Sequence, residues 1–190
     1  MIFVGIDNAN EGAVTIFDIN KTCIGAITWK VVTRKKKKKF YIEFYHCLFK
    51  VEKSYMCDKD FVKLSSIISR IIRMYNCEGI QIAIEDVFVR NNIKTCIILA
   101  KNAARVSAIL ELELNTTVEW VMPRSWRANL SMKIQKRKGA KEAGLNYIPK
   151  ITKGLDEVLN ILGRLDHLTD SAGIALYLID KHRREESGKR

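Results

Sequence analysis

The chain has 190 residues, of which 47% are hydrophobic, and it carries a formal net charge of +12 at pH 7. This length and apolar content predict one globular domain with a sizeable core. No apolar run reaches the roughly 20 residues of a membrane span, and no signal-peptide pattern opens the sequence, so we expect a cytoplasmic protein. The five cysteines have no CxxC spacing, which disfavours a disulfide framework or a zinc site. The basic excess favours a polyanion such as nucleic acid as partner, although a basic charge alone also fits a protein that binds none.

Hydrophobic periodicity predicts strands in the first part of the chain and mainly helices in the second. In chain order, the expected elements are strands at 2–7, 13–19, 23–32 and 40–51, a helix at 58–75, a strand at 80–89, a helix at 92–114, a strand at 116–121, and helices at 123–130, 136–147, 154–163 and 164–183. This order predicts a single α/β domain over 1–183, with a central mixed sheet covered by helices, followed by a polar basic tail at 184–190.

A basic run, Lys35–Lys39, separates the strands expected at 23–32 and 40–51. Its position predicts the tip of a long hairpin. Lysines there could keep a strand edge from aggregating or could contact phosphates, and the sequence leaves both roles open.

Ionisable residues interrupt apolar segments at three places. A carboxylate within an apolar strand costs several kcal/mol unless it is paired or bound to a metal. Alternation within `IAIEDVF` does not decide which of its two acids faces the core. The residues concerned are Asp7 at the end of the first strand, Glu85 and Asp86 in a later strand, and Asp166, His167 and Asp170 at the start of the last helix.

Helical periodicity of about 3.6 residues per turn places Asp170 on one face with both Asp166 and His167. Together with Asp7 and Glu85 across a sheet, these side chains would form an oxygen-rich site for hard divalent ions. Two Mg²⁺ ions about 4 Å apart would activate water and stabilise the leaving oxygen of a phosphodiester. The single residues also have ordinary interpretations: a turn cap for Asp7, a helix N-terminal carboxylate for Asp170, and a structural histidine at 167.

Three segments, `GID` at 5–7, `IEDVF` at 84–88 and `DHLTDSAGIAL` at 166–176, resemble in sequence and order the RuvC-type Holliday junction resolvases. These enzymes belong to the ribonuclease-H-like nuclease superfamily, so the resemblance implies a mixed five-stranded sheet flanked by helices. It also implies a metal-dependent endonuclease that resolves Holliday junctions by paired symmetric nicks, with other branched DNA as a further substrate class. The long stretch around 30–47 suggests a divergent phage or viral member, which would act in the bacterial host cytoplasm.

The resemblance assigns the catalytic metal site to four residues, Asp7, Glu85, His167 and Asp170, which would bind two Mg²⁺ ions, with Mn²⁺ as a substitute. Asp166 competes with its neighbour for one ligand position. We take His167 as the ligand and Asp166 as a residue that supports it.

The resemblance also implies DNA contacts and a homodimer. One aromatic residue would wedge into the junction, and basic residues between the last strand and the final helix would face phosphates, one of them as a catalytic lysine. Packing and solvation are the alternatives for these side chains. The residues are Phe88, Arg127, Lys136, Arg137, Lys138 and the catalytic Lys141. Helix 92–114 corresponds to the dimer element of the family, and a two-fold dimer suits two symmetric nicks.

Two other functions fit the same fold. One is cleavage of RNA–DNA hybrids of the ribonuclease H type, and the other is a junction-binding protein without catalysis. The presence of all four ligand types favours an enzyme.

Overall fold

The computed structural model describes residues 1–9, 11–34, 37–46, 49–57, 61–74, 78–86, 93–130, 137–163 and 166–188. Its strands are β1 (Ile2–Asp7), β2 (Gly12–Asp18), β3 (Cys23–Arg34), β4 (Lys37–His46), β5 (Phe49–Cys57), β6 (Ile80–Glu85) and β7 (Val118–Val121). Its helices are α1 (Phe61–Met74), α2 (Ile93–Leu114), α3 (Pro123–Asn129), α4 (Arg137–Tyr147), α5 (Leu155–Leu162) and α6 (Asp166–Gly188), with a 3-10 turn at Ile148–Ile151.

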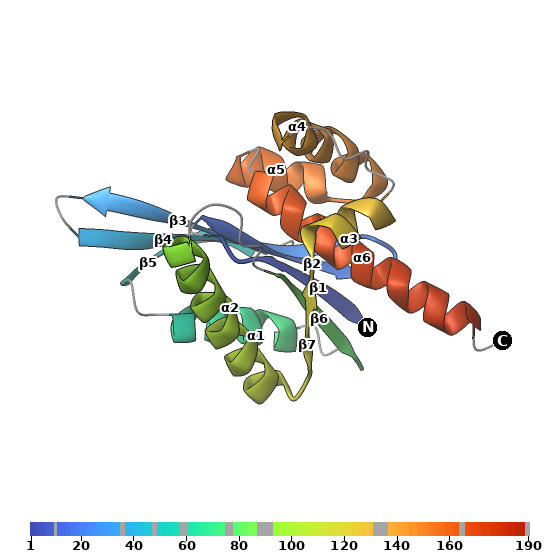
Figure 1. Ribbon diagram of the computed structural model, residues 1–190, viewed down its shortest axis with the longest axis horizontal. Coiled ribbons are helices and arrows are strands. Elements are labelled where there is room, and N and C mark those ends of the chain that lie inside the picture. The colour runs from blue at the N-terminus through green and yellow to red at the C-terminus, as the bar shows by residue number, and fades with distance from the viewer. Residues whose placement is uncertain are drawn as a thin grey trace.

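The strands form one mixed sheet in the order β5-β4-β3-β2-β1-β6-β7 across the described residues (Figure 1). Neighbouring strands from β1 to β5 are antiparallel, whereas β6 pairs in parallel with β1 and β7 in parallel with β6. The predicted α/β class is confirmed, and β3-β2-β1-β6-β7 is the predicted five-stranded mixed sheet. β4 and β5 extend it at one edge.

The extension comes from the region that the sequence predicted as a single strand at 40–51. That region contributes to two strands, because β4 ends at His46 and β5 begins at Phe49. The β3–β4 register continues as far as the pair Arg34 and Lys37, so the two strands form a long hairpin, and Lys37, Lys38 and Lys39 belong to β4. Lys35 and Lys36 lie outside the described residues.

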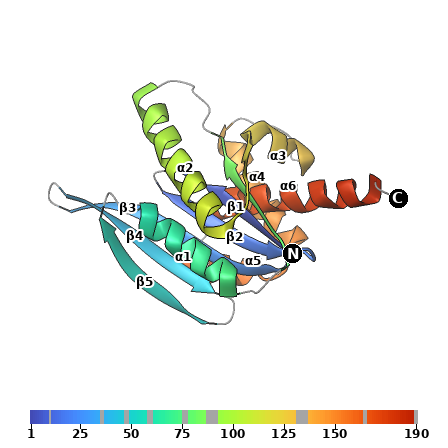
Figure 2. The same cartoon turned by 90° about the horizontal axis from the view of Figure 1, so that it is seen from below.

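Helices cover both faces of the sheet (Figures 1 and 2). On one face, alternate residues of β1, namely Ile2, Val4 and Ile6, join a core with buried residues of α1 and α2. On the other face, Phe3 joins a core built mainly by α3, α5 and α6. The period of two in a strand therefore places Gly5 and Asp7 on the α6 side as well.

Helix α6 crosses β1 at very close range. A Cβ atom on Gly5 would overlap the carbonyl oxygen of Ser171 and lie 2.6 Å from the amide nitrogen of Ala175. Only a glycine at this position allows the two backbones to touch. This contact sets the first turns of α6 directly above the end of β1.

The last helix is longer than the sequence suggested. Residues 184–188, expected in a polar tail, continue α6 as far as Gly188. No helix in the described part of the chain is both long enough and apolar enough to cross a membrane.

Candidate active site

Two carboxylates lie at the ends of neighbouring parallel strands. Asp7 is the last residue of β1 and Glu85 the last of β6, and the register pairs Ile6 with Ile84 just before them. Ala83 belongs to the core on the α6 side, so Glu85, two residues later, faces that side too. The sequence did not show whether Glu85 or Asp86 faces the site, and the structure shows that Glu85 does.

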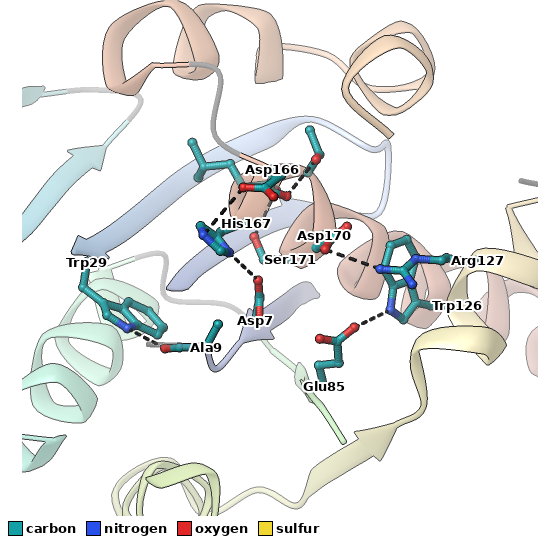
Figure 3. Close-up of polar contacts among 12 residues, drawn as sticks. Asp7, Ala9, Trp29, Glu85, Trp126, Arg127, Asp166, His167, Asp170 and Ser171 are labelled. Carbon is teal, nitrogen blue, oxygen red and sulfur yellow. Dashed lines mark hydrogen bonds and ion pairs between the residues drawn. The ribbon is translucent and has the colours of Figure 1, made fainter. Parts of the chain in front are cut away.

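The start of α6 supplies the opposite wall of the site (Figure 3). The Nδ1 atom of His167 lies 3.0 Å from Oδ2 of Asp7, and its Nε2 atom lies 3.6 Å from Oδ1 of Asp166. The imidazole thus lies between two carboxylates. The structure brings both competing residues to the site, with His167 next to Asp7 and Asp166 on the far side of the ring.

Helix α3 contacts the two remaining carboxylates through consecutive residues. The indole Nε1 of Trp126 donates a hydrogen bond of 3.2 Å to Oε1 of Glu85, and Nη2 of Arg127 lies 3.4 Å from Oδ2 of Asp170. The Arg127 guanidinium also stacks over the Trp126 ring, 4.5 Å from its centre. Pro123 at the first helical positions favours the start of this short helix.

The loop after β1 is anchored by two long-range contacts. Asn8 is only 5% exposed, and its Nδ2 donates to the carbonyl of Leu99 in α2 at 3.2 Å. Trp29 donates from Nε1 to the carbonyl of Ala9, also at 3.2 Å. Among the described residues, the Oδ1 atom of Asn8 has no hydrogen-bond partner. These contacts hold the backbone that follows Asp7.

The electrostatics of the site are dominated by crowded negative charge. Burial, followed by the negative charges of Asp7 and Asp170, raises the pKa of Glu85 from 4.5 to about 8. The Trp126 hydrogen bond and the Arg127 charge lower this pKa, but less strongly. Protein cations therefore do not fully neutralise the three carboxylates.

This pKa predicts a pH-dependent stability in the absence of divalent ions. A raised folded-state pKa contributes stability that is complete below about 4.5 and is lost as the pH rises through about 8. We expect the unfolding free energy in EDTA to fall by about 2–4 kcal/mol over this window, since one pKa unit is worth about 1.4 kcal/mol. Urea titrations of wild type and Glu85→Gln at pH 5 and pH 8.5 measure the difference.

Glu85→Gln removes this titration, so its stability should vary less with pH than that of the wild type. Glu78→Gln, at an exposed position before β6, is the matched control and should keep the wild-type slope. Equal slopes for wild type and Glu85→Gln would contradict the raised pKa.

The side chains of the site suit hard divalent cations, because three carboxylates whose charge the protein neutralises only in part meet an imidazole there. Within the described residues, however, no group of three or more His, Cys, Asp or Glu side chains is arranged to hold a metal ion as it stands. Each of the three carboxylates instead contacts a different protein side chain: Asp7 contacts His167, Glu85 contacts Trp126, and Asp170 contacts Arg127. The metal assignment of these residues therefore stays a prediction.

The residues predicted to contact DNA do not all lie at the site formed by the four predicted metal ligands. Arg127, expected to face phosphate, forms an ion pair with Asp170. Phe88 and Lys136 lie outside the described residues. Arg137, Lys138 and Lys141 belong to α4, which packs against α6. Their DNA contacts stay predictions.

Sequence reasoning missed Trp126. It lies in the segment `PRSWRANL`, whose arginines drew attention because of their charge. A tryptophan carries a single N–H donor that needs a partner when buried, and this was the available clue.

No protein-family model matches the chain, and a search of curated proteins finds no match. Solved structures do match. RuvC of Thermus thermophilus in complex with a Holliday junction substrate has a TM-score of 0.58 and 17% identity, covering 97% of this chain and 96% of that one. Another Thermus thermophilus RuvC structure has a TM-score of 0.52 and 16% identity, covering 97% of both chains. Over nearly its whole length, this chain therefore has the ribonuclease-H-like fold of RuvC.

Proposed function

We propose that the protein is a metal-dependent endonuclease that resolves Holliday junctions by paired symmetric nicks. The observation that carries this proposal is the meeting of Asp7, Glu85, His167 and Asp170 at one end of a RuvC-like sheet. A related structure contains a Holliday junction substrate, and the net charge of +12 suits a DNA partner.

The proposed ligands of two Mg²⁺ ions, or of Mn²⁺ in their place, are these four residues. Bound divalent ions would activate the attacking water and stabilise the charge that develops on the scissile phosphate. Glu85 must be ionised to act as a ligand, and Trp126 and Arg127 already favour its charged form. Asp166, 3.6 Å from His167, would orient the imidazole.

The proposed DNA contacts come from α4, which holds Arg137, Lys138 and Lys141, and from Phe88 and Lys136. Basic side chains bind phosphates without regard to sequence and make the affinity depend on salt. In this proposal Lys141 also acts at the scissile phosphate.

A substrate panel tests the proposed activity. Synthetic four-way, three-way and linear duplex DNA and an RNA–DNA hybrid are incubated with the protein, with Mg²⁺ or with EDTA. We expect symmetric nicks with 5′-phosphate ends in the four-way junction, only when Mg²⁺ is present. Preferential cleavage of the hybrid would instead support a ribonuclease H activity, and binding without any cleavage would support a junction-binding protein.

We further propose a homodimer through α2. Large apolar side chains on this helix are exposed, among them Ile93 at 68%, Ile97 at 48% and Ile98 at 55%. In Figure 2 the N-terminal end of α2 extends away from the sheet. An exposed apolar patch of this kind is typical of a protein interface, and a two-fold dimer would present two equivalent sites to a junction.

Ile97→Asp is expected to convert the dimer to a monomer, because a charge in an apolar interface is costly to desolvate. Sedimentation equilibrium measures the mass. Ile161→Asp changes an isoleucine on α5 that is 50% exposed, on the other side of the sheet, and should remain dimeric. A monomeric wild type would contradict this arrangement.

A further inference from the structure

We propose that Trp126 is a positioning residue that holds Glu85 ready to bind metal. This inference rests on the proposed function, since it assigns a role within the same site. The support comes from the burial of the indole ring, the partner of its N–H group and the way α6 is shaped around it.

The indole ring is held in place on several sides. Trp126 is 0% exposed and is among the largest fully buried side chains in the described part of the chain. In α6, a Cβ atom on Gly173 would lie 2.5 Å from Cζ3 of the ring, so the ring fills the space that the glycine leaves. A ring held this closely has little freedom to rotate, and its N–H direction is therefore well defined.

The partner of the N–H group distinguishes this tryptophan from an ordinary core residue. A buried indole can be satisfied by any backbone carbonyl, as Trp29 is by Ala9. Trp126 instead donates to Oε1 of Glu85 at 3.2 Å. A carboxylate that accepts this hydrogen bond through one oxygen can still bind a cation through its other oxygen. Hydrogen bonds that orient a ligand in this way tune its affinity for metal.

The same ring also supports the neighbouring carboxylate. The Arg127 guanidinium lies 4.5 Å from the ring centre and reaches Asp170 at 3.4 Å. One buried side chain thus orients Glu85 directly and Asp170 through Arg127. This explains why two consecutive residues of α3 contact two different proposed ligands.

Metal binding by the whole protein tests the role. Trp126→Phe keeps an aromatic ring and removes the N–H donor, and we expect its Kd for Mn²⁺, measured by calorimetry, to rise about 10- to 100-fold. Cleavage should fall at low Mn²⁺ and recover towards the wild-type rate at saturating Mn²⁺. A loss due only to misfolding would not recover with metal.

Two further variants separate positioning from packing. Trp120→Phe, at a position 41% exposed on β7, should bind Mn²⁺ like the wild type. Gly173→Ala adds a methyl group against the ring and should weaken Mn²⁺ binding although both Trp126 and Glu85 are retained. Circular dichroism confirms that each variant is folded.

A measurement without metal tests the hydrogen bond itself. The chain has three tryptophans, so three indole N–H signals are expected in a ¹H–¹⁵N spectrum, and Trp126→Phe identifies one of them by its loss. That signal should shift in Glu85→Ala while the other two stay in place.

An unmoved signal, or an unchanged Kd for Mn²⁺ in Trp126→Phe, would overturn the inference even if the wild type cleaves junctions. A wild type that binds Mn²⁺ but cleaves no DNA would refute the proposed function, while the Kd and the indole signal still decide the role of Trp126.

Discussion

Asp7→Asn is expected to reduce junction cleavage by about 10³-fold or more while junction binding persists. Asp7 is 5% exposed, ends β1 next to Glu85, and contacts His167 at 3.0 Å, so it lies at the centre of the proposed metal site. Asparagine has nearly the same shape but lacks the charge that a divalent ion requires. DNA affinity depends mainly on basic side chains, and the loss of one negative charge does not weaken it.

Cleavage is measured with a labelled four-way junction in Mg²⁺, and binding by fluorescence anisotropy in EDTA. Asp18→Asn is the matched control, because Asp18 pairs with Ile2 at the opposite end of the β1–β2 ladder. Its carboxylate accepts hydrogen bonds from the backbone of Asn20 and Thr22, which is a turn role. If Asp7→Asn cuts within about tenfold of the wild type, Asp7 is not a metal ligand.

Gly5→Ala should lower the unfolding free energy by about 3 kcal/mol or more. The added methyl group would meet the carbonyl oxygen of Ser171 and the amide nitrogen of Ala175, both backbone atoms of α6. A flexible side chain could move aside, but a helix backbone must shift as a whole. Overpacking costs about 1–3 kcal/mol of stability where side chains can adjust. A clash with backbone atoms cannot be relieved in this way, so its cost should equal or exceed the upper value of that range.

Urea unfolding followed by circular dichroism measures this change. The matched control is Gly188→Ala, at the end of α6, where an added Cβ meets nothing within 4 Å. That variant should be close to wild type, since alanine is a better helix former than glycine. A Gly5→Ala midpoint equal to that of the wild type would show that α6 does not touch β1 as closely as described.

Three places stand out in the sequence because ionisable residues interrupt apolar segments there, and the resemblance to the RuvC-type resolvases selected Asp7, Glu85, His167 and Asp170 among them. Asp7 ends an apolar strand, Glu85 interrupts an apolar run, and His167 and Asp170 lie at the start of a largely apolar helix, so their unusual placement is visible without a structure. The order of strands and helices along the chain followed from hydrophobic period, and the mixed sheet covered by helices followed from that order. The face of Glu85 did not follow, because alternation gives two faces and does not say which of them α6 covers.

Other features depend on contacts between distant parts of the chain. The segment `FYIEFYHCLFKV` contains no glycine or proline, so nothing in it marked the boundary between β4 and β5. Trp126 and Glu85 are 41 residues apart, and Asn8 and Leu99 are 91 residues apart. Such pairings arise only when the helices pack on the sheet. The ion pair between Arg127 and Asp170 was not predicted, because charge alone does not show which carboxylate lies within reach of an arginine.

The two faces of β1 have a consequence for how this protein could change in length. Odd-numbered positions of the strand face α6 and even-numbered positions face α1 and α2. Deletion or insertion of a single residue within β1 would reverse this assignment for part of the strand. Either Asp7 would point away from His167, or a bulky isoleucine would take the place of Gly5 under α6. β1 can therefore accept substitutions that keep polarity and size, but the number of residues between Ile2 and Asp7 must stay the same.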